Sequence, residues 1–427
     1  MKLSRKLGTL LLGTALLAAA TPLEMLLKPK EQEELGQEVR EYYDAFEKGD
    51  GLAKAKSALA ESLQKHNEKL SKKAKEDVDV LSSTEDLAAI FAFSREYPKR
   101  SAVGKVSDFS ADTRIGFPVE YALLAPKSYK PGKGALPLVL IIPDEGDGRA
   151  KMARKQLDED WMLGELRDGA VLAALTMPED VSLWGKSGGG DKLGGLETVM
   201  FALRQICVDY EIDSDRVFLA GHGAGVAAAV DVANVFPFVF AGVIGRAGDL
   251  GDVAPTNFRN LPSYFAGGGS GVSRFAEAAG KLDYKNVTVK PAALLDDVWK
   301  WIQSTKRVAN PTAISFAPTS QIGGCYWLSI DGFDPESEGK PEITAEIDRE
   351  KNVIAITSKG IRSATLMFND ALVDLDREVL VICNGVDHKD TFKRNLSTAL
   401  DQYFRSNDAG RIYTNYQFYD LTEEEGN

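Results

Sequence analysis

The sequence predicts an α/β protein built on a doubly wound, mostly parallel sheet, with a helical region before it and a β-rich domain after it. Short apolar runs such as 136–143 are hydrophobic on both faces, which is typical of buried parallel strands. Amphipathic helical segments such as 194–210 alternate with these runs, as a doubly wound sheet requires. After residue 310 the polarity instead alternates with period two, which favours an antiparallel sandwich.

Length and composition limit the classes of function. A chain of 427 residues is long enough for two or three domains, and 44% hydrophobic residues is an ordinary globular content. Lys and Arg number 51 against 63 Asp and Glu, which gives a net charge of −12. Without a basic cluster, this acidic chain is not expected to bind nucleic acid or an anionic membrane surface.

The first 20 residues have the pattern of a secretory signal peptide. Basic residues at positions 2, 5 and 6 precede an apolar run over 7–17, and alanines at 18–20 suit cleavage. The run is short for a membrane span, and no later apolar segment of about 20 residues follows. We therefore expect a secreted or periplasmic protein, attached to a membrane only if this segment stays uncleaved.

The expected domain organisation follows from these sequence patterns. The boundaries are a signal peptide at 1–20, a helical region at 31–98, an α/β domain at 105–308 and a β-rich accessory domain at 310–424. Helices are expected at 34–47, 52–74, 87–93, 194–210, 225–234, 273–281, 293–305 and 394–405. Strands are expected at 117–125, 136–143, 171–175, 217–220, 239–245, 262–266 and 286–289, and in the last domain at 313–317, 325–330, 342–347, 353–357, 364–368, 379–383 and 413–419. The first helices could bind a partner or pack on another domain, and the sequence leaves both open.

The most informative stretch is Gly221-His222-Gly223-Ala224-Gly225. A run of strand formers precedes it and a helix of small residues follows, which is the frame of a nucleophile elbow, G-x-S-x-G. The central position, where a hydrolase carries its serine, is Gly223. His222 occupies a position that often serves packing, with its side chain directed away from the general-base site.

Four segments resemble secreted bacterial α/β-hydrolases of the esterase and prolyl-oligopeptidase-like kind. They are 121–131, 136–146, 212–225 and 261–269, and the resemblance covers a little under half of the chain. It implies an α/β-hydrolase fold with a serine at 223, an acid just after 267–269 and a histidine in the loop after the last strand. It also implies a His-Gly pair in the oxyanion loop, near residues 144–146.

None of these groups is present in the sequence. Residues 270–273 hold no carboxylate and residues 290–297 hold no histidine. The oxyanion loop contains Asp144-Glu145-Gly146, and carboxylates there would oppose a developing oxyanion. We therefore predict no catalytic residues and an exported pseudohydrolase with a binding or scaffolding role. The alternative is a serine hydrolase with displaced groups, for example Ser270 or Ser273 as nucleophile.

No cofactor or metal site is expected. Asp144, Glu145 and Asp147 lack EF-hand spacing, and residues 184–192 do not match a phosphate-binding loop. The three cysteines, Cys207, Cys325 and Cys383, match no zinc motif, although an oxidising compartment would allow a Cys325–Cys383 disulfide. His66 and His388 are expected on the surface, His388 in a turn. The ligand or partner, whether small molecule or protein, stays unknown.

Overall fold

The computed structural model describes residues 25–99, 102–113, 118–144, 149–179, 181, 183–189, 192–319 and 323–422. The predicted signal peptide at 1–20 lies outside these residues, as do Glu145, Gly146 and Asp147 of the altered oxyanion loop. Within the described ranges, no helix combines the length and the apolar character needed to cross a bilayer.

The centre of the molecule is an eight-stranded sheet with the order β1-β2-β4-β3-β5-β6-β7-β8. β2 runs antiparallel to both of its neighbours, and every pairing from β4 to β8 is parallel. The strands are β1 (Ser107–Asp112), β2 (Pro118–Leu124), β3 (Leu136–Ile142), β4 (Val171–Leu175), β5 (Ile212–His222), β6 (Gly242–Arg246), β7 (Ser263–Ala266) and β8 (Val287–Lys290). The predicted α/β-hydrolase-like, doubly wound sheet is confirmed.

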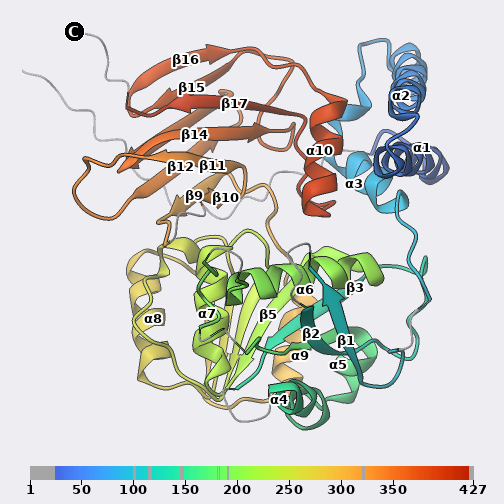
Figure 1. Cartoon of the computed structure of the whole chain (residues 1–427). Helices are drawn as coiled ribbons and strands as arrows, with labels where there is room; N and C mark the ends of the chain where they lie inside the picture. The colour runs from blue at the N-terminus through green and yellow to red at the C-terminus, as the bar shows by residue number, and fades with distance from the viewer. Residues whose placement is uncertain are drawn as a thin grey trace, which may run out of the picture.

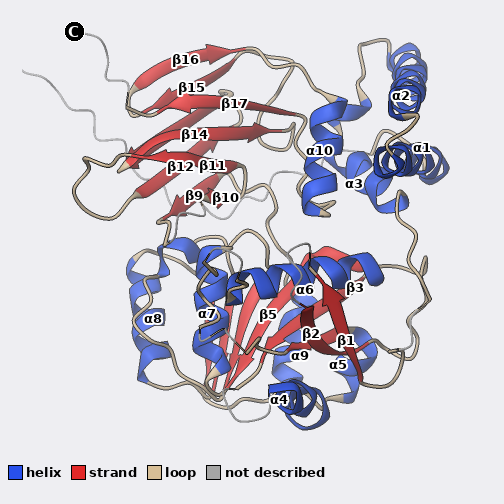
Figure 2. Ribbon diagram, in the orientation of Figure 1, coloured by secondary structure: helices blue, strands red, loops and turns tan. Residues whose placement is uncertain are grey.

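Helices cover both faces of this sheet (Figure 2). α6 (Gly195–Asp209), α7 (Gly225–Val235) and α8 (Ser270–Lys281) share one core with Leu138 and Leu140 of β3. Val139 and Ile141 of the same strand face a second core, because successive side chains of a strand point to opposite faces. That second core contains α4 (Arg149–Lys155), a π-helical turn over Gln156–Asp160, α5 (Gly164–Gly169) and α9 (Leu295–Ser304).

The C-terminal region is β-rich, as predicted. A four-stranded sheet contains β10 (Gly324–Cys325), β11 (Leu328–Phe333), β14 (Ile361–Phe368) and β17 (Asn415–Asp420). A five-stranded sheet contains β16 (Val386–Asp390), β15 (Val379–Cys383), β13 (Val353–Lys359), β12 (Glu342–Asp348) and β9 (Ala313–Phe316). The two sheets share one apolar core, and no disulfide links Cys325 to Cys383, which are both buried free thiols.

Three local predictions for this region are wrong. The expected strand at 325–330 is a hairpin, because Tyr326 takes a left-handed φ of 59° and the chain reverses between β10 and β11. The sandwich is not antiparallel throughout, because β13 and β15 pair in parallel. His388 lies in β16 and not in a turn. The turn falls earlier, at Asn384 and Gly385, whose φ values of 48° and 95° suit a two-residue hairpin.

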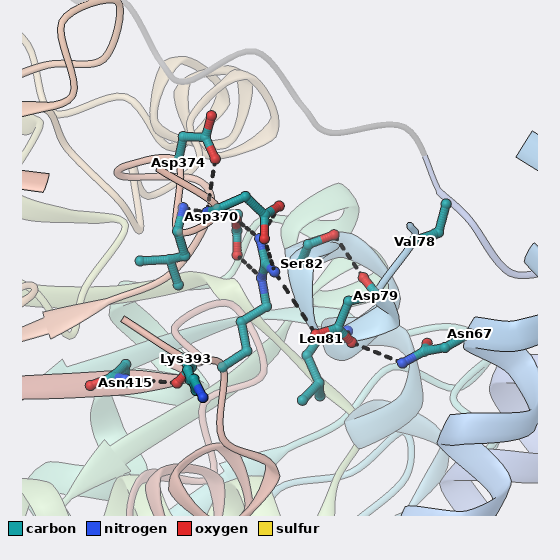
Figure 3. A network of polar contacts seen from close by, with 12 residues as sticks. Asn67, Val78, Asp79, Leu81, Ser82, Asp370, Asp374, Lys393 and Asn415 are labelled. Carbon is teal, nitrogen blue, oxygen red and sulfur yellow. Dashed lines mark hydrogen bonds and ion pairs between the residues drawn. The ribbon is translucent and has the colours of Figure 1, made fainter. Parts of the chain in front are cut away.

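The N-terminal helices α1 (Pro29–Lys48), α2 (Leu52–Ala74) and α3 (Thr84–Phe93) pack on α10 (Leu396–Ser406), far along the sequence (Figure 1). Leu35 and Phe91 share an apolar core with Leu400 and Tyr403 of α10. A polar network extends this contact (Figure 3, in which Asp79 and Asp370 are labelled). The Arg394 guanidinium donates to Asp370 at 2.7 Å and lies 3.9 Å from Asp79, next to α3.

A buried arginine joins the α/β domain to the chain that follows α10. The side chain of Arg307 is 1% exposed and its Nη2 lies 2.8 Å from Asp215 Oδ1, in β5. The same nitrogen lies 2.6 Å from Asp408 Oδ1, two residues after α10. One guanidinium thus bridges two carboxylates from distant parts of the sequence and fixes how the domains meet.

We expect Arg307→Met to lower the free energy of unfolding by about 3–5 kcal/mol, because it leaves two carboxylates without their buried partner. Urea unfolding with linear extrapolation measures this loss. Arg405→Met is the matched control, since Arg405 is exposed and its i,i+4 pair with Asp401 should contribute roughly 0.5 kcal/mol or less. Equal losses in the two variants would contradict the role given to Arg307.

Candidate functional site

The strand–turn–helix over residues 221–225 is formed as the sequence predicts. β5 ends at His222, α7 begins at Gly225, and Gly223 between them has a left-handed φ of 57°. A Cβ at Gly221 would overlap the backbone of Gly225, and one at Gly225 would overlap the backbone carbonyl of Ile142. These two glycines are therefore needed for the close packing of α7 behind the turn.

The carboxylate of Asp144 occupies the place where a side chain at position 223 would begin. Asp144 follows β3 by two residues, and its Oδ1 accepts a hydrogen bond from the Ala224 N–H. A Cβ on Gly223 would overlap both carboxylate oxygens of Asp144. On this fold, the N–H after the nucleophile is an oxyanion donor. In this protein that donor is already bound to an anion.

His222 lies between two carboxylates. Its Nδ1 is 3.9 Å from Asp144 Oδ2 and 4.0 Å from Asp160 Oδ2, distances too long for hydrogen bonds. The Nδ1 atom is buried and has no hydrogen-bond partner among the described residues. Asp160 comes from the π-helical turn that follows α4, so the cluster combines residues at the ends of β3, of this turn and of β5.

Arg246 ties this cluster to the loop after the last strand. It is the final residue of β6, pairs with His222 in the sheet register and is buried. Its Nη1 donates to the Asp160 carbonyl at 2.6 Å and its Nη2 to the Ala293 carbonyl at 3.2 Å. The guanidinium carbon lies 4.9 Å above the Trp161 ring. Burial lowers the pKa of Arg246, and the nearby Asp160 opposes this effect.

A carboxylate does lie beside Gly269, but it comes from another loop. Asp249 follows β6 and accepts hydrogen bonds from the backbone N–H groups of Leu250 at 2.9 Å and Val272 at 3.0 Å. Donation from Val272 and then Leu250 lowers the pKa of Asp249. This acid therefore caps the first turn of α8 and does not orient a histidine.

The two serines of the alternative hypothesis are also engaged in the first turn of α8. Ser270 Oγ accepts from Arg274 Nη1 at 3.2 Å, and Ser273 Oγ donates to the Gly269 carbonyl at 3.3 Å. In the described part of the chain, neither hydroxyl is hydrogen-bonded to a histidine. His66 lies on α2 and His388 on β16, both outside the α/β domain.

Sequence reasoning did not identify Asp160, Arg246 or Asp249. Arg246 had a usable signal, because a charged residue directly after a buried apolar strand lies at the carboxyl edge where ligands bind in α/β folds. Asp160 and Asp249 had none, since their positions depend on how the loops fold back. Among the described residues, no group of three His, Cys, Asp or Glu side chains could hold a metal ion.

A groove of about 660 Å³ runs along α7 from the elbow toward the β-sandwich. Ala224, Ala228 and Asp231 line it from the elbow and α7, while Trp184 and Lys340 line it from a neighbouring loop and from the sandwich. Burial raises the pKa of Asp231, and Lys186 opposes this shift. The groove falls within the usual size range of small-molecule sites.

The α/β domain has the α/β-hydrolase fold. Solved structures with detectable similarity include a thermostable esterase, with a TM-score of 0.39 and 16% identity over 47% of this chain and 63% of that one. A ferulic acid esterase has a TM-score of 0.35 and 12% identity over 47% of this chain and 94% of its own. An S-formylglutathione hydrolase from Agrobacterium tumefaciens has a TM-score of 0.35 and 13% identity over 48% of this chain and 96% of its own.

The chain spans less than two thirds of the length of the thermostable esterase. No protein-family model and no curated protein matches the sequence. The assignment of the fold rests on the strand order of the sheet and on the geometry of the elbow.

We expect Gly223→Ser to destabilise the protein, because the new Cβ must displace Asp144 from the Ala224 N–H. Hydrogen bonds to charged groups contribute roughly 1.5–3 kcal/mol, and a left-handed non-glycine residue adds about 1 kcal/mol of strain. Gly251→Ser is the control, since a Cβ there meets nothing within 4 Å. Adding Asp144→Ala to Gly223→Ser should recover part of the loss. Urea unfolding that gives equal stabilities for the two single variants would disprove the overlap.

Asp249 provides a pH-dependent prediction. Its pKa is lowered in the folded state, so its stabilising effect is present above the ordinary aspartate pKa and disappears as the pH falls through the lowered value. The stability difference between wild type and Asp249→Asn should therefore be largest near neutral pH and vanish in acid. Urea titrations across this range test it, and a difference that stays constant with pH would be incompatible with the assignment.

Proposed function

We propose that this protein is an exported, non-catalytic α/β-hydrolase-fold protein, a pseudohydrolase that acts by binding or scaffolding. The observation that carries the proposal is the Asp144 carboxylate at the elbow. It fills the space in which a nucleophilic side chain at position 223 would lie. It also accepts the hydrogen bond of the Ala224 N–H, the donor that would otherwise face an oxyanion.

Acyl transfer on this fold requires a nucleophile, a base within reach of it and donors for the oxyanion. Gly223 supplies no nucleophile, and the loop over 290–294 contains no histidine. An oxyanion next to Ala224 would lie against a carboxylate and be repelled by it. Each of these conditions independently opposes hydrolysis.

A binding role is supported by the groove of the α/β domain. The groove along α7 starts at the elbow and has both apolar and charged lining residues, including Trp184, Asp231 and Lys340. Ligand pockets commonly combine an apolar surface with a few polar groups that fix orientation. Export is inferred from the signal-peptide pattern over residues 1–20.

We expect no covalent labelling by a fluorophosphonate probe and no turnover of short-chain p-nitrophenyl esters above buffer. Gly223→Ser alone should remain inactive, because no base or acid is placed to activate the new hydroxyl. Labelling followed by intact-protein mass spectrometry and initial rates of ester hydrolysis measure these outcomes.

Ser270→Ala and Ser273→Ala are the controls for the alternative of a displaced nucleophile. Wild-type labelling that either substitution abolishes would establish a displaced serine hydrolase. Efficient turnover by Gly223→Ser would show that a base is present and would refute the proposal.

A further inference from the structure

A second cavity, of about 480 Å³, lies at the opposite edge of the sheet from the elbow. Ser214 and Val217 near the start of β5 line it, as do Phe236 and Phe238 just before β6. The elbow, by contrast, follows the carboxyl end of β5. Figure 1 shows the sandwich and α10 above this part of the α/β domain, with α4, which lies beyond the end of β3, at the bottom. The cavity is thus separate from the degenerate hydrolase site.

The interior of this cavity is mainly apolar. Its walls come from α6, β5, the segment before β6, and the end of α10 with the turn that follows it. The apolar lining residues are Leu196, Met200, Phe201, Leu203, Val217, Phe236, Phe238 and Val239. A chamber of this size and character fits the body of a small apolar or amphipathic ligand.

The acidic groups in the lining are already bound to protein donors. Glu197 Oε2 accepts from the backbone N–H groups of Gly188 at 3.1 Å and Gly194 at 2.9 Å. Asp408 is held by the buried Arg307, 2.6 Å from its Nη2. Both carboxylates are thus held by protein donors, and the four arginines of the lining outnumber them, so the cavity wall has a net positive charge.

Arg411 lines this cavity, with its Nη1 3.9 Å from Asp408 Oδ2. Its Nη2 donates to the Tyr326 carbonyl at 2.9 Å, and its guanidinium carbon lies 4.4 Å above the Phe238 ring. Its Nε is buried and has no hydrogen-bond partner among the described residues. The guanidinium therefore contributes a cationic group to the wall of the cavity, next to the Phe238 ring.

Two further arginines, Arg204 and Arg405, line the cavity and are exposed. A guanidinium binds carboxylate oxygens strongly, and three of them around an apolar chamber favour an anionic head group. We propose that this cavity binds an anionic amphiphile, specifically a medium- or long-chain carboxylate. Its chain lies among the apolar residues of α6 and its head group is held by Arg411 with Arg204 and Arg405.

Isothermal titration of the purified protein with dodecanoate, below its micelle concentration, tests the proposal. Dodecanol and dodecyltrimethylammonium have the same chain with a neutral and a cationic head group. We expect dodecanoate to bind at one site per chain and at least tenfold more tightly than either analogue.

Variants locate the binding site. Met200→Trp should fill the chamber and weaken dodecanoate binding at least tenfold, whereas Val208→Trp on the exposed side of the same helix should not. Arg411→Gln should weaken dodecanoate binding and leave dodecanol binding unchanged. Because Arg411 also contacts Tyr326, the double variant Arg204→Gln/Arg405→Gln provides an exposed alternative with the same expected direction.

Absence of dodecanoate binding, or wild-type binding by Met200→Trp, would overturn the site. Equal affinities for dodecanoate and dodecanol would overturn the anionic head group. These outcomes are independent of ester hydrolysis at the elbow, so failure here leaves the pseudohydrolase proposal intact, and the converse also holds.

Discussion

The hydrogen bond from the Ala224 N–H to the Asp144 carboxylate constrains everything that the elbow can do. An elbow places the residue after its turn so that the backbone N–H faces the reaction centre. Here an internal carboxylate lies at that N–H, and Gly223 provides the space that the carboxylate needs. Each feature depends on the other, because a side chain at position 223 would displace Asp144 and an empty oxyanion position would leave a donor unpaired. The glycine and the acid therefore form one structural unit.

The rest of the molecule is arranged so that the sandwich and the N-terminal helices lie away from this unit. Arg307 links β5 to the turn after α10, and Arg394 links that region to the N-terminal helices. Arg307 makes its contact near the amino end of β5, and Arg394 makes its contacts outside the α/β sheet. As a result the domains meet around the apolar cavity under α10, while the groove along α7 connects the two edges.

The parts of this structure that follow from local sequence were predictable. The elbow, the alternation of strands and helices, and the β-rich texture after residue 310 are short-range patterns, and the structure has all of them. The failures involve long-range pairing. The residues of β13 and β15 do not indicate that the two strands pair in parallel. His388 is expected in a turn but lies in a strand, because the hairpin turn is formed by Asn384 and Gly385.

The candidate site likewise has features that the sequence shows and features that depend on tertiary packing. The identity of Gly223 and the acidic character of the oxyanion loop are visible in the sequence, but the position of the Asp144 carboxylate is not. That Asp144 reaches the Ala224 N–H depends on how the chain leaves β3 beside α7. Likewise Asp249 supplies a carboxylate at Gly269 from a different loop, which spacing along the chain cannot reveal. Tertiary packing, not residue type, determines the role of each acid.

The most direct test of this account is the amide resonance of Ala224. Labelling alanine nitrogen and glycine carbonyl carbon restricts the spectrum to the three Gly-Ala pairs at 134–135, 169–170 and 223–224, and the signal lost in Ala224→Ser assigns the third. If its N–H is bound to the Asp144 carboxylate, its chemical shift should move clearly in Asp144→Ala, which removes the acceptor, while the resonances of Ala135 and Ala170 stay in place. An Ala224 resonance that keeps its wild-type position in Asp144→Ala would contradict the claim that Asp144 fills the elbow.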